Sequence, residues 1–453
     1  MGYNIIFFEK YPFMGVELLN CLIKNYSLIS YNVDPSYNLL KKSGFFISTY
    51  GNHNLTANID SDIAVATILK DDQYLKALTK THGDDLMFLF FYMSDEMELL
   101  CKKIKIPIAL PSYGIQKKLG NKLHIRNICE KLGIETNTSM NINLSKENNL
   151  ARIYKRCEKK LGIPFIIQGE QGVSGENTIK IINYREFVKT VKKLGGKYRA
   201  TRYLNQIIPV SVHICITKRR ILYEGPYPQI VGFKELTSNP FQFSGNDTNQ
   251  KMFTEKVKSN INYMSLKLAN YAKKSGYRGI LGIDFIWNRY TDRIYVQEIN
   301  SRLVGLTRLI TGIQKEQGIT PHLIEHLNEF VPIANLFRRI NKPVNLSKSN
   351  YSQIYISNNS NHNIRTKNYL RPGIYRISKK TLIRTKNSLF LSDMNKNEVL
   401  INFFAYKGTL LEPGQIISKI ILKKSVLNRN KYELSKVSKD LISLIKSYAT
   451  NSL

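Results

Sequence analysis

The sequence lacks the cysteine pattern of a disulfide-stabilised or zinc-binding protein. No two of its cysteines form a CxxC pair, and their number is odd: Cys21, Cys101, Cys129, Cys157 and Cys215. No apolar run approaches the roughly 18 residues that a membrane helix needs. The N-terminus, "MGYNIIFFEKYPF", does not have the pattern of a signal peptide. We therefore expect a cytoplasmic protein with no membrane segment.

Acidic residues are scarce, with 34 Asp and Glu against 67 Lys and Arg, which gives a net charge of +33. Such a charge can attract nucleic acid, anionic lipid or anionic substrates. The basic residues are spread along the chain, however, and no stripe of alternating basic and aromatic residues marks a nucleic-acid platform. A bias towards Lys, Asn and Ile explains the charge equally well. Nothing except the net charge supports a nucleic-acid partner, so we favour small-molecule partners.

The N-terminal part alternates between strand-like and helix-like segments. This pattern predicts a parallel, Rossmann-like α/β unit over residues 1–113. The strands are expected at 3–9, 27–34, 62–69, 85–94 and 107–112. The dinucleotide motif GxGxxG is absent, so the sequence does not support dinucleotide binding.

The rest of the chain changes texture near Asn341. Before that point, the pattern predicts long helices at 115–134 and 255–276 and several strands between them. After it, short strands alternate with polar turns, and 388–392 is one of those expected strands. With 453 residues, the chain is expected to form about two to four domains. We take 341–453 as a mostly β accessory domain.

A loop of small residues, "GEQGVSGENT", lies between two expected strands. Gly169, Gly172 and Gly175 let the backbone approach a ligand closely, and Ser174 can donate to a phosphate oxygen. The alternative is an ordinary flexible hairpin loop.

Acidic residues gather in the segment "ILGIDFIWNRYTDRIYVQEINSR", which reads as a hairpin of two apolar strands joined by a polar turn. The two-residue period places Glu298, Asn300 and Arg302 on one face, and Asp284 can face Glu298 across the pair. Two carboxylates and an amide oxygen are hard ligands for Mg²⁺. Arg302 could hold a phosphate. The alternative is a solvent-facing strand pair with surface charges. We do not favour it, because both strands are otherwise strongly apolar.

Taken in order, these motifs resemble those of the ATP-grasp superfamily, and its biotin-carboxylase-like branch matches best. The likeness covers roughly residues 1–330, and "EINSR" is its most specific motif. It implies α/β and α+β architecture: an ATP-grasp fold with a Rossmann-like domain at 1–113, a central lobe at 114–200 and a C-terminal lobe with the metal site at 201–340. The β-rich accessory domain at 341–453 would follow.

The resemblance also implies roles for single residues. Asp284, Glu298 and Asn300 would be ligands of Mg²⁺, with Mn²⁺ as an alternative ion. Arg302 would stabilise an acyl phosphate or its transition state. Lys122, in "GNKLHIRNICEKLGI", matches the first lysine that contacts ATP phosphate.

The same resemblance places the nucleotide between two lobes. The loop Gly172–Gly175, with Ser174, would close over the phosphates, and the backbone near Tyr203 and Leu204 would contact the adenine. Most members carry a second lysine where this chain has Gln168. A neutral amide can donate to a phosphate but adds no charge, so ATP affinity or transfer rate is in doubt.

A second departure is Thr201–Arg202, which stands where an acid often meets the ribose. The segment "GPYPQIVGFKELTSNPFQFSGND" resembles a poorly characterised biotin-carboxylase-like subgroup. It makes four polar residues candidates for the nucleotide or acceptor pocket: Lys234, Glu235, Asn246 and Asp247. His213 on a neighbouring strand either lines the site or is an ordinary core histidine.

The function implied is an ATP-dependent ligase that activates a carboxylate as an acyl phosphate, which an amine, a thiol or another nucleophile then attacks. Its partners would be small-molecule or peptide carboxylates and amines. The alternatives are a biotin-carboxylase-type enzyme, a nucleotide-binding regulator that has lost catalysis, and a nucleic-acid binder. The accessory domain could cover the active site, hold an acceptor or mediate a homodimer.

Overall fold

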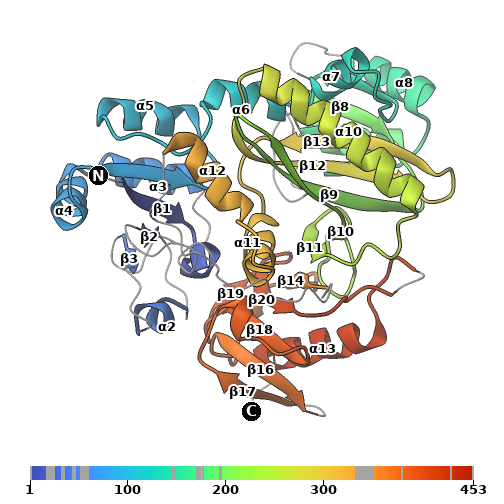
Figure 1. Cartoon of the computed structure of the whole chain (residues 1–453). Coiled ribbons are helices and arrows are strands. Elements are labelled where there is room, and N and C mark those ends of the chain that lie inside the picture. The colour runs from blue at the N-terminus through green and yellow to red at the C-terminus, as the bar shows by residue number, and fades with distance from the viewer. Residues whose placement is uncertain are drawn as a thin grey trace.

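The computed structural model describes residues 3–16, 26–31, 36–42, 47–50, 61–144, 149–169, 175, 178–192, 196–331, 350–378, 381–428 and 431–450. Three bodies of structure are visible in Figure 1: an N-terminal α/β unit, a lobe that holds β8 and α8, and a large sheet that runs into the C-terminal strands. No helix in these ranges is long and apolar enough to cross a membrane.

The N-terminal unit is built on a parallel sheet of four strands in the order β3-β2-β1-β4. Both faces are covered, since the central strands are buried almost throughout, as parallel strands usually are. Its strands are β1 (Asn4–Glu9), β2 (Tyr26–Ser30), β3 (Ile47–Thr49) and β4 (Leu86–Phe90). Its helical elements are η1 (Pro12–Gly15), α2 (Ser36–Lys42), α3 (Ser61–Leu69), α4 (Asp72–His82) and α5 (Asp95–Lys103). The predicted parallel α/β unit is confirmed.

The strand predicted at 62–69 is wrong, because this segment is helix α3. Ala64, Val65, Ile68 and Leu69 are buried, whereas Ile63 is 58% exposed. This is a helical period, and a short apolar run rich in β-branched residues does not distinguish it from a strand. Residues 107–112 also form no strand, since only Ile108 makes a single bridge, to Phe88.

The central lobe is an antiparallel sheet of four strands in the order β5-β8-β6-β7. Its strands are β5 (Ser139–Asn143), β6 (Phe165–Gly169), β7 (Thr178–Ile181) and β8 (Lys197–Arg202), and its helices are α8 (Leu150–Leu161) and α9 (Tyr184–Val191). The two helices pack their apolar faces on the sheet, where Tyr154 and Phe187 meet Phe165.

The single helix predicted at 115–134 is divided into α6 (Tyr113–Gly120) and α7 (Ile125–Lys131). The break falls at Gly120 and Asn121, and the side-chain Oδ1 of Asn121 accepts a hydrogen bond from the backbone N–H of Leu123 at 2.8 Å. Asparagine favours such local turns over a helix interior. Lys122 therefore projects from a turn between two helices.

The third body is a sheet of ten strands in the order β13-β12-β9-β10-β11-β14-β20-β18-β16-β17. The strands nearest the central lobe are β9 (Ile207–Ile216), β10 (Ile221–Val231), β11 (Phe243–Asp247), β12 (Gly279–Asn288) and β13 (Arg293–Asn300). The C-terminal strands are β14 (Ser352–Ser357), β16 (Gly373–Ser378), β17 (Thr381–Lys386), β18 (Glu398–Phe404) and β20 (Ile416–Leu422). A small separate pair is formed by β15 (Ile364–Arg365) and β19 (Leu410–Leu411).

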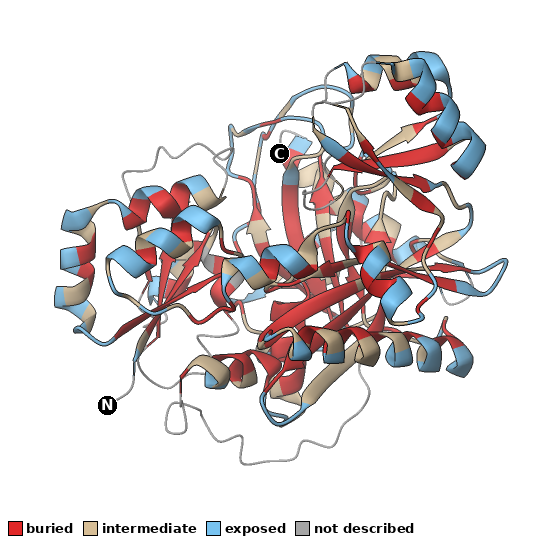
Figure 2. Ribbon diagram, turned by 90° about the horizontal axis from the view of Figure 1, so that it is seen from above, coloured by how far each residue is buried: buried red, intermediate tan, exposed pale blue. Residues whose placement is uncertain are grey.

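Helices cover this large sheet: α10 (Glu255–Lys274), α11 (Thr307–Glu316), α12 (His322–Phe330) and α13 (Lys436–Thr450). Figure 2 shows buried residues following the strands and exposed residues following the outer faces of the helices. One hydrophobic cluster joins the N-terminal sheet to α11 and α12. The strand predicted at 388–392 is wrong, because the segment ends in the 3-10 turn η2 (Leu391–Asp393).

The pairing of β11 with β14 makes the C-terminal strands a continuation of the large sheet. At this junction Gly245 has φ +139, and a Cβ there would lie 2.0 Å from the carbonyl oxygen of Gln353. Only glycine lets the two strands approach this closely. Residues before and after position 341 thus share one sheet.

Candidate active site

The acidic hairpin is formed by β12 and β13, in which Asp284 lies directly opposite Glu298. The register shifts just after this pair, between Asp284 and Phe285. Such a bulge re-aims side chains and is common beside functional sites. The alternation expected from the sequence also holds for Asn300, whose amide approaches both carboxylates.

Asp284 is held by donors from three other strands of the sheet, β9, β10 and β13. The Ser211 hydroxyl and the Gln229 amide donate to its Oδ1 at 2.9 and 2.8 Å, and the Asn300 amide donates to its Oδ2 at 2.9 Å. Sequence reasoning missed Ser211 and Gln229, because their contribution depends on which strands become neighbours. Ser211 pairs with Asp284 in the register of β9 with β12.

Lys122 reaches this hairpin from the turn after α6. Its Nζ lies 3.0 Å from Glu298 Oε2, and both side chains are mostly buried. Burial raises the pKa of Glu298, but the charge and hydrogen bond of Lys122, the charge of Arg302 and the hydrogen bond of Asn300 together outweigh burial and lower the pKa below its usual range. Burial, followed by the charge of Glu298, raises the pKa of Asp284 to about 7. When two acids lie close together in a site with little water, one is expected to stay charged while the pKa of the other rises.

Arg302 follows β13 and extends the same set of polar groups. Its guanidinium donates to Asn300 Oδ1 at 3.2 Å and to the Leu303 carbonyl at 3.0 Å. It also lies over the Phe91 ring, 5.4 Å from the centroid. Burial lowers the pKa of Arg302, while the charges of Glu298 and Asp284 oppose this change. The guanidinium is thus fixed beside the acids.

The donor set suits a hard divalent cation. Two half-buried carboxylates face each other, and the Asn300 side chain can offer its oxygen by rotating its amide. Paired buried acids are costly without a neutralising cation. In the described part of the chain, no group of three or more His, Cys, Asp or Glu side chains is placed to hold a metal. A metal at the hairpin would therefore depend on Asp284, Glu298 and Asn300 together.

Gln168 lies near the end of β6 and faces the hairpin from the central lobe. Its Oε1 accepts a hydrogen bond from the Gln297 amide at 2.9 Å. Directly opposite Gln168, on β8, lies Arg199, which is only 2% exposed and donates to the Gln297 carbonyl at 2.8 Å. Sequence reasoning missed Arg199 because only the register of β6 with β8 places it there. The two lobes thus touch through Gln297, the neighbour of Glu298.

The loop after Gln168 is only partly described. Gly172 and Ser174 lie outside the described residues. Gly175 has φ +83, and a Cβ there would lie 2.0 Å from the Phe241 carbonyl oxygen. Gly175 therefore lies close to the segment that precedes β11.

Tyr203 and Leu204 lie in the connection between β8 and β9, which joins the sheet of the central lobe to the large sheet. Both are partly exposed. The Lys180 ammonium lies over the Tyr203 ring, 3.9 Å from its centroid. Both residues thus lie in the segment that connects the two lobes, and their contact with adenine stays a prediction.

The candidate residues Asp247, Asn246 and Glu235 contact the C-terminal part of the chain. Asp247 accepts hydrogen bonds from the backbone N–H groups of Val426 and Leu427 at 2.8 and 3.1 Å. Asn246 accepts from the Gln353 amide at 3.1 Å, and Glu235 pairs with Lys439 at 3.0 Å. None of these contacts involves the hairpin. Lys234 donates no side-chain contact to it in the described part either, although its carbonyl accepts from Asn359.

His213 is an ordinary core histidine and does not line the site. It is fully buried, with ring nitrogens 3.2 Å from His322 Nδ1 and 3.2 Å from Thr307 Oγ1. Burial, with the charges of neighbouring histidines, lowers its pKa well below the usual value. His213 is therefore neutral and structural.

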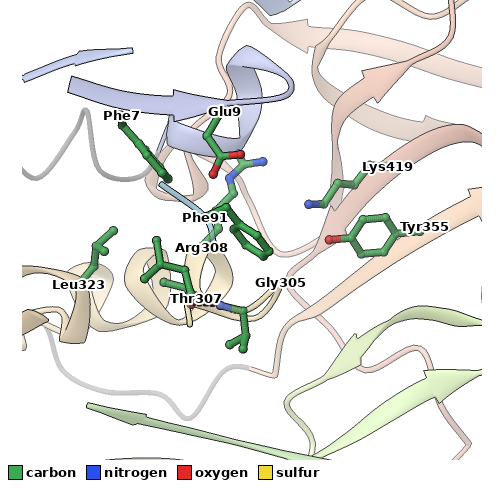
Figure 3. A pocket seen from close by; sticks show the side chains of 11 residues that line it. Phe7, Glu9, Phe91, Gly305, Thr307, Arg308, Leu323, Tyr355 and Lys419 are labelled. Atoms are coloured by element: carbon green, nitrogen blue, oxygen red, sulfur yellow. Dashed lines mark hydrogen bonds between the residues drawn. The ribbon is translucent and has the colours of Figure 1, made fainter. Parts of the chain in front are cut away.

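A pocket lies beside Arg302 (Figure 3) and is lined by Phe91, the residues Leu303, Val304 and Gly305 that follow Arg302, and the charged side chains of Glu9, Arg308 and Lys419. Glu9 comes from the end of β1, Arg308 from α11 and Lys419 from β20. Lys419 and the Tyr355 hydroxyl point toward the side where Glu9 and Arg308 lie.

Charge inside this pocket is poorly neutralised. Glu9 and Lys419 are each 3% exposed, and neither forms an ion pair with a described residue. The Lys419 ammonium instead lies 4.4 Å from the Tyr355 ring centroid. Burial raises the pKa of Glu9 to about 8, although the Lys419 charge lowers it. Burial and the charge of Arg308 lower the pKa of Lys419 well below its usual value.

No family model matches the chain, and no curated protein sequence matches it. Solved structures do match over nearly its whole length. A biotin carboxylase from Campylobacter jejuni, solved as a β-γ-ATP complex, is 13% identical with a TM-score of 0.63, covering 93% of this chain and 87% of that one. The biotin carboxylase domain dimer of the 2-oxoglutarate carboxylase from Hydrogenobacter thermophilus, solved with MgADP, ADP and bicarbonate, is 14% identical with a TM-score of 0.64, covering 94% and 87%.

An N5-carboxyaminoimidazole synthase from Aspergillus clavatus, solved with ADP and 5-aminoimidazole ribonucleotide, is 12% identical with a TM-score of 0.59, covering 98% of this chain and 99% of that one. At such identities the likeness concerns the fold. The chain therefore has the fold of these proteins, and the ATP-grasp fold class predicted from its sequence is confirmed.

Proposed function

We propose that this protein is an ATP-dependent ligase that joins a carboxylate to an amine, a thiol or another nucleophile through an acyl phosphate. One observation carries the proposal: Lys122 reaches Glu298 from a distant turn, and Glu298 forms a half-buried acid cluster with Asp284 and Asn300, with Lys122 and Arg302 at its border. The ATP-grasp fold supports it, since similar structures were solved as complexes with β-γ-ATP or ADP.

Two steps account for the chemistry. A carboxylate oxygen of the substrate attacks the γ-phosphorus of ATP, and the bond to ADP breaks. The nucleophile then attacks the acyl carbon, inorganic phosphate leaves, and an amine nucleophile loses a proton. Both steps gain mainly from positioning and from neutralised charge.

The residues of the hairpin supply that neutralisation. Asp284, Glu298 and Asn300 would hold Mg²⁺, with Mn²⁺ as an alternative, and the ion would offset the phosphate charge. Lys122, which now pairs with Glu298, would contact a phosphate. Arg302, fixed by Asn300 and the Leu303 carbonyl, would face the phosphoryl group in transfer.

The pocket of Figure 3 would hold the substrate that is not a nucleotide. It begins directly after Arg302 and carries two cations and one acid. A buried ammonium that has no ion pair with a described residue favours a ligand that brings an anion. We propose that Lys419 and Arg308 receive a carboxylate or phosphate group of that substrate, and that Glu9 contacts its amine or hydroxyl group.

Two other functions have specific support. The solved biotin carboxylases share the fold and most of the chain length, which favours a biotin-carboxylase-type enzyme. The neutral Gln168 favours a nucleotide-binding regulator without catalysis. The paired, half-buried acids of the hairpin favour the ligase over the regulator, because an inactive protein gains little from keeping them. A homodimer of this chain and a cytoplasmic location are further proposals.

The test is a calorimetric titration of ATP, with and without Mg²⁺, into the wild type and Glu298→Ala. We expect Mg²⁺-dependent binding that the substitution weakens at least about tenfold, roughly 1.4 kcal/mol. Glu255→Ala is the matched control, since the Glu255 side chain is 89% exposed. An absence of ATP binding by the wild type would contradict the proposal. Binding would justify a screen of carboxylates with amines for ADP release, and bicarbonate in that screen tests the carboxylase alternative.

A further inference from the structure

Arg199 is a buried cation that forms no ion pair with a described residue. It lies on β8, directly opposite Gln168 on one side and Asn141 on the other. Residues opposite each other in antiparallel strands project from the same face of the sheet. Arg199 therefore shares a face with Gln168, and this face is turned toward β13, as the contacts of both residues with Gln297 show.

The guanidinium of Arg199 keeps unused donors. Arg199 is 2% exposed, and only one of its terminal nitrogens donates, to the Gln297 carbonyl. Its Nε and its other terminal nitrogen have no hydrogen-bond partner in the described part of the chain. Leaving a buried donor unpaired costs about 1–3 kcal/mol, and more for a charged group. A well-packed protein is expected to keep such a group only where something else uses it.

The two unpaired nitrogens form one edge of the guanidinium. Nε and a terminal nitrogen are the pair that arginine uses to bind two oxygens of one carboxylate or phosphate. Burial lowers the pKa of Arg199 to about 10, against the raising effect of Glu298, so the group stays charged at neutral pH. The unpaired edge thus fits an oxyanion that the protein itself does not supply.

The surroundings of Arg199 join it to the hairpin. Gln297, which accepts its hydrogen bond, is the neighbour of Glu298. On the same face of the sheet, the Asn141 amide donates to the Leu123 carbonyl at 3.2 Å, in the turn that carries Lys122. The free edge of Arg199 therefore lies between the lobes, close to the two residues on which the proposed nucleotide site depends.

We propose that Arg199 is a phosphate-binding residue of the nucleotide site, and that it supplies from β8 the positive charge that Gln168 does not supply from β6. This inference rests on the proposed function and adds one contact to it. A bound nucleotide would place phosphate oxygens against Nε and the free terminal nitrogen. The hydrogen bonds of Gln297 with Arg199 and Gln168 would open to admit it.

The experiment compares the affinities of Mg-ATP, Mg-ADP and adenosine for the wild type, Arg199→Gln, Gln168→Lys and the double variant. Arg199→Gln is expected to weaken Mg-ATP at least tenfold and to leave adenosine within about twofold, because only phosphate contacts are lost. In the double variant, the lysine introduced by Gln168→Lys restores a cation on the same face, so most of the Mg-ATP affinity should return. In the wild-type background, Gln168→Lys should bring little or no gain, since two cations would then adjoin.

Lys197→Gln, an exposed lysine at the start of the same strand, is the matched control. A structural role of Arg199 predicts something different: equal weakening of Mg-ATP and adenosine, a lower Tm and no rescue by Gln168→Lys. That result would overturn the inference. So would Mg-ATP affinity within about twofold of wild type in Arg199→Gln. Arg199→Lys, which keeps the charge but loses the paired donors, is expected to bind Mg-ATP with an intermediate affinity and covers the case in which Arg199→Gln does not fold.

The failure of this inference can be told from the failure of the proposed function. If the wild type binds no ATP, the function fails. If the wild type binds Mg-ATP and Glu298→Ala weakens it, while Arg199→Gln does not, the function stands and Arg199 is only structural.

Discussion

Two regions of the molecule bury charge, and they do so in opposite ways. At the hairpin, each acid already has partners, as Lys122 meets Glu298 and the Ser211, Gln229 and Asn300 side chains meet Asp284. In the neighbouring pocket, Glu9 and Lys419 are more deeply buried but form no ion pair with any residue that the structure describes. A site whose charges are held in place is prepared for chemistry, whereas a site with unmatched charges is prepared for a ligand that completes it.

The largest effect is expected from a substitution at the hairpin. In Arg302→Gln, kcat for ADP release should fall by about 10²–10³, because one fixed donor to a developing charge is lost. The Kd of Mg-ATP should change little, which separates transition-state stabilisation from binding. Arg293→Gln, an exposed arginine at the start of β13, is the control. A large loss of ATP affinity without a loss of kcat would contradict this role.

A smaller effect is expected in the pocket. Lys419→Met should raise the KM of the non-nucleotide substrate found in the ADP-release screen by about 10- to 100-fold, the loss of one hydrogen bond to a charged group. ATP affinity should stay the same. The matched control is Lys439→Met, an exposed lysine that pairs with Glu235. If KM for ATP rises instead, the pocket and the nucleotide site are not distinct, and the comparison fails.

Per pH unit, the smallest effect is expected in the pH dependence of stability. The Glu9 pKa is raised by burial to about 8, so the stability this carboxyl contributes is fully present below its unfolded pKa near 4.5 and is lost as pH rises toward 8. Glu9→Gln removes this dependence. Relative to wild type, the free energy of unfolding of the variant should therefore increase by about 1.4 kcal/mol per pH unit between roughly pH 5 and 8.

Urea unfolding at three pH values measures this difference. Glu96→Gln, in which an exposed carboxyl is neutralised, should show no such trend. Parallel curves for wild type and Glu9→Gln would mean that the charge of Glu9 is balanced within the folded protein. The pocket would then resemble the hairpin.

Much of the hairpin could be predicted because its chemistry is local. The two-residue period of one strand pair places Asp284 opposite Glu298 and Asn300 beside them. The turn at Asn121 that presents Lys122 could not be predicted from a helical run, although "GN" is a signal for it. The sequence also misled at 62–69, where β-branched residues form a buried helix because the neighbouring helices and sheet cover it.

The pocket and the second cation could not be predicted at all. Glu9 and Lys419 are separated by most of the chain, and only the packing of β1 near β20 brings them together. Arg199 is one of many basic residues in the sequence. Its importance appears only when β6 and β8 pair and two of its donors prove to have no partner among the described residues. Strand register and tertiary contacts place both the pocket residues and Arg199. Neither of these produces a periodic pattern in the sequence.

The shared sheet also decides where the chain can be cut. If it ended near residue 340, β11 would lose β14 and show a row of unpaired backbone donors and acceptors at a new edge. Gly245 would leave that edge flat, with no side chain to shield it. Open edges of this kind recruit other strands. A truncated protein would thus be an aggregation hazard, and any shortened form made for expression or crystallisation should retain the C-terminal strands.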